Sequence, residues 1–123
     1  MAGDRPHSYK MIGSVAADTS RLIDSTYGPD VSDETRVYRR TTNKLAEEIG
    51  EVAEAIGGWL GENPRKGVTH TLDDVLTELL DVASCALGAY EHLTGNLGLS
   101  EEALVQRLRF TNARLREALS HGG

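Results

Sequence analysis

Apolar residues recur along this chain with the period of an α-helix, and this pattern limits the possible folds more than any other feature does. They return at steps of three and four residues in four stretches, at residues 12–23, 37–59, 75–93 and 104–119. Segments that contain glycine, proline or asparagine separate these stretches, at residues 27–30, 61–67 and 95–96. The sequence therefore predicts an all-α, bundle-like domain of four main helices, in which one long helix can be kinked or broken.

Polar residues that commonly cap helices stand before three of these stretches. Ser32 or Asp33 is placed to cap the second helix. Thr71 with Asp74 resembles a capping box, with Asp in the position usual for Glu or Gln. Ser100 precedes the last stretch, where two acids in the following turn suit the helix dipole. These residues predict where three of the four helices begin.

The size and composition of the chain fit one domain that associates with copies of itself. Its 123 residues are the length of a single domain, residues 1–123. Hydrophobic residues make up 39% of the chain, which is lean for a lone monomer. A helical chain of this size often completes its core by pairing with a copy of itself. We therefore expect a helical bundle completed by homo-oligomerisation, as a homodimer or a dimer of dimers.

Charge and cysteine content favour a soluble cytoplasmic protein. The net charge of −6 argues against binding to nucleic acid or to an anionic membrane, because both need a basic surface. Cys85 is the only cysteine, so no disulfide within the chain points to secretion. No stretch approaches the roughly 20 apolar residues of a membrane span, and the first residues contain no apolar run typical of a signal peptide. An acidic protein can still bind an anionic nucleotide if metal ions bridge the two.

The acids of the second stretch do not all point the same way. At about 100° per residue, Glu48 falls at the edge of the apolar stripe, and Glu51 lies one turn further on, displaced toward the polar side. Glu47 and Glu54 fall on the more solvated face. The best-placed inward-leaning pair is therefore Glu48 and Glu51, with Glu47 a weaker candidate.

The third stretch repeats this arrangement with Glu78 and Asp81, which are three residues apart beside its apolar stripe. A single acidic pair is most often a solvated helix face, but two helices packed together would bring both pairs into one site. Like charges there repel, and Mg²⁺ relieves the repulsion because it takes oxygen ligands. A di-iron site is not indicated, because no histidine of the chain follows a Glu by three residues.

Two segments resemble the motifs of the MazG-like nucleoside triphosphate pyrophosphatases. KLAEEIGEVAEA, which contains Glu48 and Glu51, resembles the EExxE segment of that family, and ELLDV, from Glu78, resembles its ExxD segment. NPRKGVTHTLDDVLTELLDV, from Asn63, is similar to the middle of small actinobacterial MazG-like proteins. The resemblance covers roughly residues 40–90, within a motif-bearing core of about residues 32–95.

This resemblance implies a MazG-like helical bundle that hydrolyses a nucleoside or deoxynucleoside triphosphate between the α and β phosphates. The products are the monophosphate and pyrophosphate, and the expected role is housecleaning of the nucleotide pool. It implies Mg²⁺ as the cofactor, with Mn²⁺ as a substitute. Carried over by motif, the metal ligands are Glu48, Glu51, Glu78 and Asp81. Glu47 matches the first acid of EExxE and would help to orient water.

The last stretch departs from the family pattern. Many relatives carry a Lys, an Asn and an Arg along the final helix, where these residues hold phosphates. Asn112 is present here, whereas Arg109 and Arg116 flank it at other offsets. The three residues are candidate substrate contacts, and a structural hydrogen bond to a neighbouring helix is the other role open to Asn112.

Three further residues are candidate substrate contacts. Trp59 continues the apolar stripe, which favours core packing, although an aromatic residue near this point in relatives can stack on the base. Arg65 and Lys66 lie in the loop at residues 61–67. They are either solvated loop charges or cationic donors to a triphosphate.

Two other functions stay open on the sequence alone. One is a non-catalytic helical dimerisation module on the same scaffold. The other is a nucleotide-binding regulator that keeps metal and ligand but hydrolyses slowly. The full set of four acids favours the enzyme over the module, and the irregular last helix favours the regulator.

Overall fold

The computed structural model describes residues 4–122, with side chains from Met11 onward, and every regular element in that range is helical. The elements are α1 (Asp4–Ser25), α2 (Asp33–Tyr38), the π-helical turn η1 (Arg39–Asn43), α3 (Lys44–Leu60), α4 (Leu72–Leu93) and α5 (Ser100–His121). The predicted all-α class is confirmed. The predicted domain covers residues 1–123, of which 1–3 and 123 lie outside the described residues.

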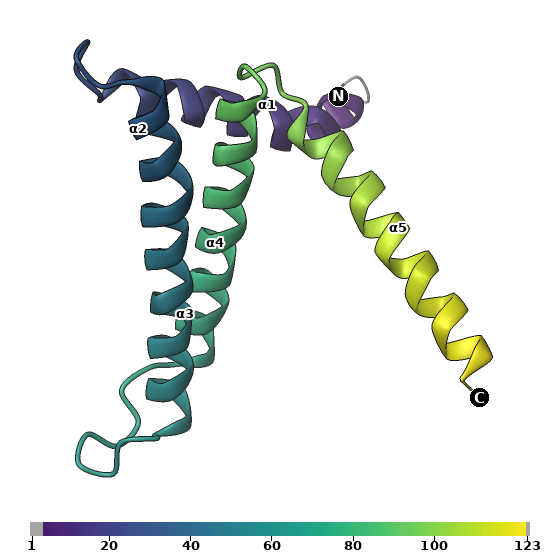
Figure 1. Ribbon diagram of the computed structural model, residues 1–123. Helices are drawn as coiled ribbons and strands as arrows, with labels where there is room; N and C mark the ends of the chain where they lie inside the picture. Colours follow the sequence, from purple (N-terminus) through teal and green to yellow (C-terminus); the bar gives the residue numbers. More distant parts are fainter. Residues whose placement is uncertain (1–3, 123) are drawn as a thin grey trace.

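Helices α3 and α4 lie side by side as an antiparallel hairpin, with the connecting loop at one end of the molecule (Figure 1). Helix α1 crosses the other end of this hairpin and packs against α4. Helix α5 starts near the crossing and then runs away from α4, so that its C-terminal half stands apart from the hairpin (Figure 1). Four main helices are present, as predicted, and in the single chain they form an open arrangement.

Two of the three predicted helix caps are confirmed. Ser32 accepts the backbone N–H of Thr35 at 3.2 Å. Thr71 and Asp74 form the predicted capping box, each side chain accepting the other's backbone N–H. The prediction for Ser100 is wrong: its hydroxyl makes no capping hydrogen bond and is buried without a partner. The first turn of α5 is held from outside the helix instead.

The sequence predicts that one long helix can be kinked or broken without indicating which one. A π-helical turn at Arg39–Asn43 interrupts the second long helix. It carries the charged side chain of Arg40 into the interior, where only 5% of that residue is exposed. The guanidinium donates to Asp24 Oδ1 at 2.8 Å, to Ser20 Oγ at 3.0 Å and to the Gly88 carbonyl at 2.9 Å. One buried cation therefore joins α1, η1 and α4, which fixes how α3 enters the hairpin.

Asp24 receives this cation together with a second donor. Its other oxygen lies 2.9 Å from Nδ1 of His92 on α4. Burial alone would raise the pKa of Asp24, but the hydrogen bond and charge of His92, together with the charge of Arg40, outweigh it and lower the pKa. The Asp24 carboxylate is therefore an ionised link between α1 and the C-terminal end of α4.

The apolar core of the single chain is small. The fully buried hydrophobic side chains among those described are Ala17, Ala55, Val75 and Ala89. Many larger ones on α1, α4 and α5 stay exposed, among them Leu80 on α4, which is 71% exposed. None of the described helices is long and apolar enough to cross a membrane.

Candidate metal centre

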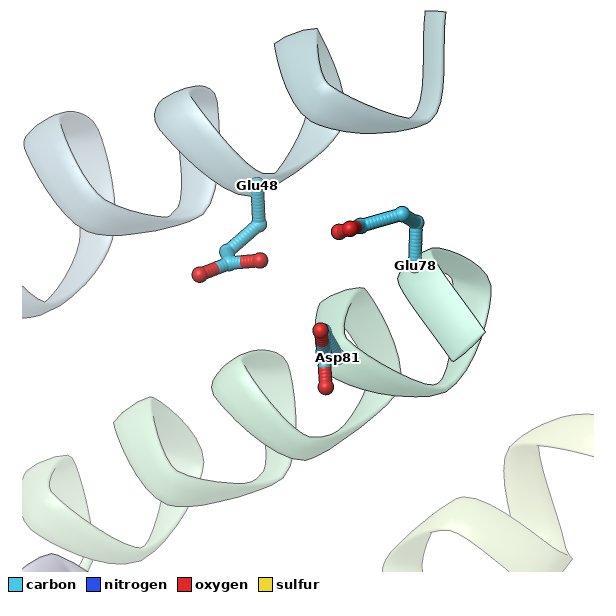
Figure 2. A group of neighbouring side chains, drawn as sticks. All are labelled: Glu48, Glu78 and Asp81. Carbon is cyan, nitrogen blue, oxygen red and sulfur yellow. The ribbon is translucent and has the colours of Figure 1, made fainter. Parts of the chain in front are cut away.

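Three of the predicted acids meet between α3 and α4. Glu48 lies near the start of α3, and Glu78 and Asp81 lie one turn apart on α4, so that their carboxylates point into the space between the two helices (Figure 2). One oxygen from each of the three lies within 4.8 Å of the others. The three-residue spacing puts Glu78 and Asp81 on one face of α4, and the antiparallel packing brings Glu48 opposite them.

Two carboxylate oxygens of this cluster are buried and unpartnered. Glu48 is only 9% exposed. Its Oε2 and the Oε2 of Glu78 are inaccessible to solvent and have no hydrogen-bond partner. A buried carboxylate oxygen without a partner carries a large desolvation cost. A hard divalent cation held by these acids would offer such oxygens a ligand bond.

Glu51 lies one turn after Glu48 on α3 and is half-buried. It is not one of the three acids whose oxygens converge. The negative charge of Glu48 raises the pKa of Glu51, and partial burial and the charge of Glu78 add to the effect. Glu51 therefore experiences the charge of the cluster. The side chain of Glu47 is 58% exposed, and its Oε1 lies 3.5 Å from Nζ of Lys44.

Lys44 is a cation beside the cluster that was not among the site residues predicted from the sequence. Its Nζ lies 3.3 Å from Glu48 Oε1 and 3.5 Å from Glu47 Oε1. The hydrogen bond to Glu48, followed by the charge of Glu47, raises the pKa of Lys44. The signal was present in the sequence, because Lys44 precedes these two acids by three and four residues, which is the spacing of helical ion pairs.

A cavity of about 300 Å³ adjoins the carboxylates between α1, α3 and α4. Its wall includes Glu48 and Asp81, and Lys44, Arg40 and Ser84 also line it. The volume lies at the lower end of the range for small-molecule sites. The carboxylate cluster therefore opens into a space that can hold part of a ligand.

Cys85 also lines this cavity. Burial, followed by the charge of Glu48, raises the pKa of its thiol. A thiol that is held protonated is a poor nucleophile.

Trp59, Arg65 and Lys66 lie toward the loop end of the hairpin, away from the carboxylates. Trp59 follows Glu48 by about 16 Å of helix at 1.5 Å per residue, and its residue is 39% exposed. Lys66 lines a separate pocket that the loop forms against the end of α3. Within one chain, the structure does not bring these three residues to the cluster.

Arg109, Asn112 and Arg116 are exposed on α5. Asn112 does make a local hydrogen bond, since its Oδ1 accepts Nε–H of Arg116 at 2.9 Å. This part of α5 stands away from α3 and α4 (Figure 1). The three residues stay predicted substrate contacts, and in one chain they do not face the cluster.

Comparison with protein-family models, curated proteins and solved structures gives no match for this chain.

Proposed function

We propose that this chain is a cytoplasmic, magnesium-dependent nucleoside triphosphate pyrophosphatase that resembles the MazG-like enzymes. The observation that carries the proposal is the convergence of Glu48, Glu78 and Asp81, with two buried carboxylate oxygens that have no partner. The motifs that contain these acids are also those on which the resemblance rests. In this proposal the chain cleaves its substrate between the α and β phosphates and acts in nucleotide-pool housecleaning.

The protein's own residues have separate roles in this scheme. Glu48, Glu78 and Asp81 would hold Mg²⁺, with Mn²⁺ as a substitute, and Glu51 would complete the set from one turn along α3. When bound there, the metal supplies charge neutralisation on the phosphates and a more acidic attacking water. Glu47 is exposed at the rim, where it can orient water. Candidate contacts to the substrate are Trp59, Arg65, Lys66, Arg109, Asn112 and Arg116.

The proposal is tested by combining metal binding with product analysis. Mg²⁺ titration followed by calorimetry should show binding that Asp81→Asn weakens. A panel of ribo- and deoxynucleoside triphosphates with Mg²⁺ should yield monophosphate and pyrophosphate for at least one member. Metal binding without either product from any nucleotide would exclude the enzyme and leave the regulator. Absence of both metal and nucleotide binding would leave only the dimerisation module.

The exposed apolar surface supports self-association and is the observation that favours the module as the second candidate. The chain exposes 9273 Å², whereas a compact monomer of 13.3 kDa is expected to expose about 6,500 Å². The excess of roughly 2,800 Å² per chain corresponds to about 5,600 Å² for a dimer, at the upper end of what obligate oligomers bury. In the enzyme, a partner chain would cover the apolar faces of α1, α4 and α5 and could bring a second α5 toward the carboxylates.

A further inference from the structure

Lys44 stands where the carboxylate cluster meets the adjoining cavity. Its Nζ lies 3.3 Å from Oε1 of Glu48, whose other oxygen is the buried, unpartnered one. The side chain of Lys44 is 54% exposed and lines the mouth of the 300 Å³ cavity together with Asp81. A ligand group that binds between the carboxylates and this cavity would therefore come within reach of a flexible ammonium group.

The second cation of the cavity wall is already engaged. Arg40 donates to the carboxylate of Asp24, to Ser20 and to the Gly88 carbonyl, and it is almost fully buried. It is thus fixed by its structural contacts. Among the described residues, Lys44 forms ion pairs only with Glu47 and Glu48 of α3, and its own side chain is 54% exposed although that of Glu48 is 11% exposed. Of the two, Lys44 is the cation that is able to change partners.

We propose that Lys44 is a phosphate-binding residue, whose ammonium group leaves Glu48 and contacts a phosphate oxygen of the nucleotide once a divalent cation occupies the carboxylates. This inference rests on the proposed function, because it assumes a nucleotide at the same site. It assigns to α3 a phosphate contact that the sequence had led us to expect only from the loop and from α5.

The exchange follows from the charges. A divalent cation on Glu48 withdraws the negative charge that attracts Lys44, which weakens the ion pair. A triphosphate presents stronger acceptors, and hydrogen bonds between an ammonium group and phosphate are charge-assisted. Without metal, the same lysine partly neutralises the cluster and limits repulsion between Glu48 and its neighbours. In this proposal Lys44 therefore pairs with Glu48 in the metal-free protein and with phosphate in the substrate-bound protein.

The alternative is that Lys44 only stabilises the first turn of α3 by its ion pairs. The two roles predict different effects of Lys44→Gln. A helix-stabilising pair would change the melting temperature slightly and leave ligand binding alone. If Lys44 contacts phosphate, Lys44→Gln should weaken nucleotide binding. Mg²⁺ binding without nucleotide should not weaken, because the substitution removes a positive charge that competes with the metal.

The experiment measures both affinities by calorimetry with the full chain. Mg²⁺ is titrated alone, and then α,β-methylene analogues of the nucleoside triphosphates are titrated in saturating Mg²⁺, since they cannot be cleaved at the α–β position. Lys44→Gln should weaken analogue binding about tenfold or more, and Lys44→Arg should recover part of that loss. Arg114→Gln, which removes the same charge from the exposed face of α5, should not alter either affinity.

Each outcome separates the inference from the function on which it rests. If the unmodified chain binds the analogue and Lys44→Gln binds it equally well, the role of Lys44 is overturned and the proposed function stands. An equal loss of analogue affinity in Lys44→Gln and Arg114→Gln would show that only the net charge matters, and it would also overturn the role of Lys44. If the unmodified chain binds no analogue with Mg²⁺, the proposed function fails first and the inference fails with it.

Discussion

The carboxylate of Glu91 accepts the backbone N–H of Ser100 at 2.8 Å, although no part of Glu91 is exposed to solvent. Its other oxygen accepts the N–H of Gly98, also at 2.8 Å. Glu91 is on the last turns of α4, and Ser100 is the first residue of α5. One buried side chain therefore fixes the connection from which α5 departs, and both of its oxygens need an N–H donor.

Glu91→Gln should destabilise the fold by about 1–3 kcal/mol, because the amide NH₂ would face one of the two backbone N–H groups and leave it without an acceptor. Urea denaturation followed by circular dichroism measures this loss. The matched control is Glu102→Gln, on the exposed first turn of α5, which should change stability by less than about 0.5 kcal/mol. Equal effects of the two substitutions would contradict this role of Glu91.

Stability should also fall in acid because of Glu91 and Asp24. Burial opposes ionisation of both carboxyl groups. Hydrogen bonds from Ser100 and Gly98 nevertheless lower the pKa of Glu91. His92 and Arg40 lower the pKa of Asp24 in the same way. A carboxyl group with a lowered pKa in the folded state stabilises the fold at neutral pH. This contribution is lost as pH falls below about 4, because the unfolded chain binds protons first.

Urea midpoints measured from pH 7 down to pH 3 test this dependence. Asp24→Asn should be less stable than the unmodified chain at pH 7 and should lose less stability on acidification. An identical acid slope in the two proteins would show that Asp24 does not contribute. Glu51 acts in the opposite direction, because its raised pKa makes protonation favour the folded state.

Local signals in the sequence identified most helix boundaries, and long-range contacts account for what they missed. The capping box at Thr71 and Asp74 is a contact over three residues, so it could be recognised from the sequence. Ser100 is a common capping residue followed by two acids, but its hydroxyl makes no capping hydrogen bond, and Glu91, nine positions earlier, accepts its backbone N–H. The burial of Arg40 depends on oxygens of Asp24 and Gly88, and no local pattern specifies such partners.

For the candidate site, helical periodicity placed Glu48, Glu78 and Asp81 on facing sides of two helices, and the structure brings these three together. Glu51 is half-buried but is not among the acids whose oxygens converge, although its spacing from Glu48 equals that of Asp81 from Glu78. The contacts expected from α5 depend on the angle at which α5 leaves α4. In one chain that angle keeps the C-terminal half of α5 away from α3 and α4 (Figure 1).

Removing charge from the cluster should abolish most activity. Glu48→Gln, Glu78→Gln and Asp81→Asn keep the side-chain shape but each removes a metal ligand, so activity should fall at least about 100-fold and Mg²⁺ binding should weaken. Pyrophosphate release and calorimetry measure the two effects. Glu54→Gln, on an exposed part of α3, is the matched control and should have little effect.

Glu51→Gln extends this test to the fourth acid. It should also lower activity and Mg²⁺ affinity, and it should leave the metal-free protein at least as stable, because repulsion from Glu48 is relieved. Melting curves in EDTA measure that stability. If Glu54→Gln reduced activity as much as Glu51→Gln, the assignment of faces on α3 would be wrong.

We expect the chain to be a homodimer or a dimer of dimers in solution, because of its large exposed apolar area. Light scattering at micromolar concentration should give a multiple of 13.3 kDa, and a particle of that single mass would contradict this expectation. Leu80→Glu, at a residue that is 71% exposed on α4, should shift the particle toward the monomer. Val68→Glu, 70% exposed in the hairpin loop, is the matched control and should leave the mass unchanged.

The origin of the oxygen in the products tests the proposed mechanism. The proposed scheme assigns no protein nucleophile: Glu48, Glu78 and Asp81 would hold the metal, and the pKa of the nearby Cys85 thiol is raised. Water should therefore attack the α-phosphorus directly, and the bond from that phosphorus to the bridging oxygen should break, so that pyrophosphate leaves.

Hydrolysis in ¹⁸O-water, followed by mass spectrometry of both products, measures this directly. One labelled oxygen should appear in the nucleoside monophosphate and none in pyrophosphate. Single-turnover reactions, with enzyme in excess, should give the same labelling, because a covalent acyl-phosphate intermediate that water opens at its carboxyl carbon would place unlabelled protein oxygen in the monophosphate of the first turnover. Label found only in pyrophosphate would mean attack at the β-phosphorus, and the proposed reaction would then be incorrect even if Mg²⁺ binds at the carboxylates.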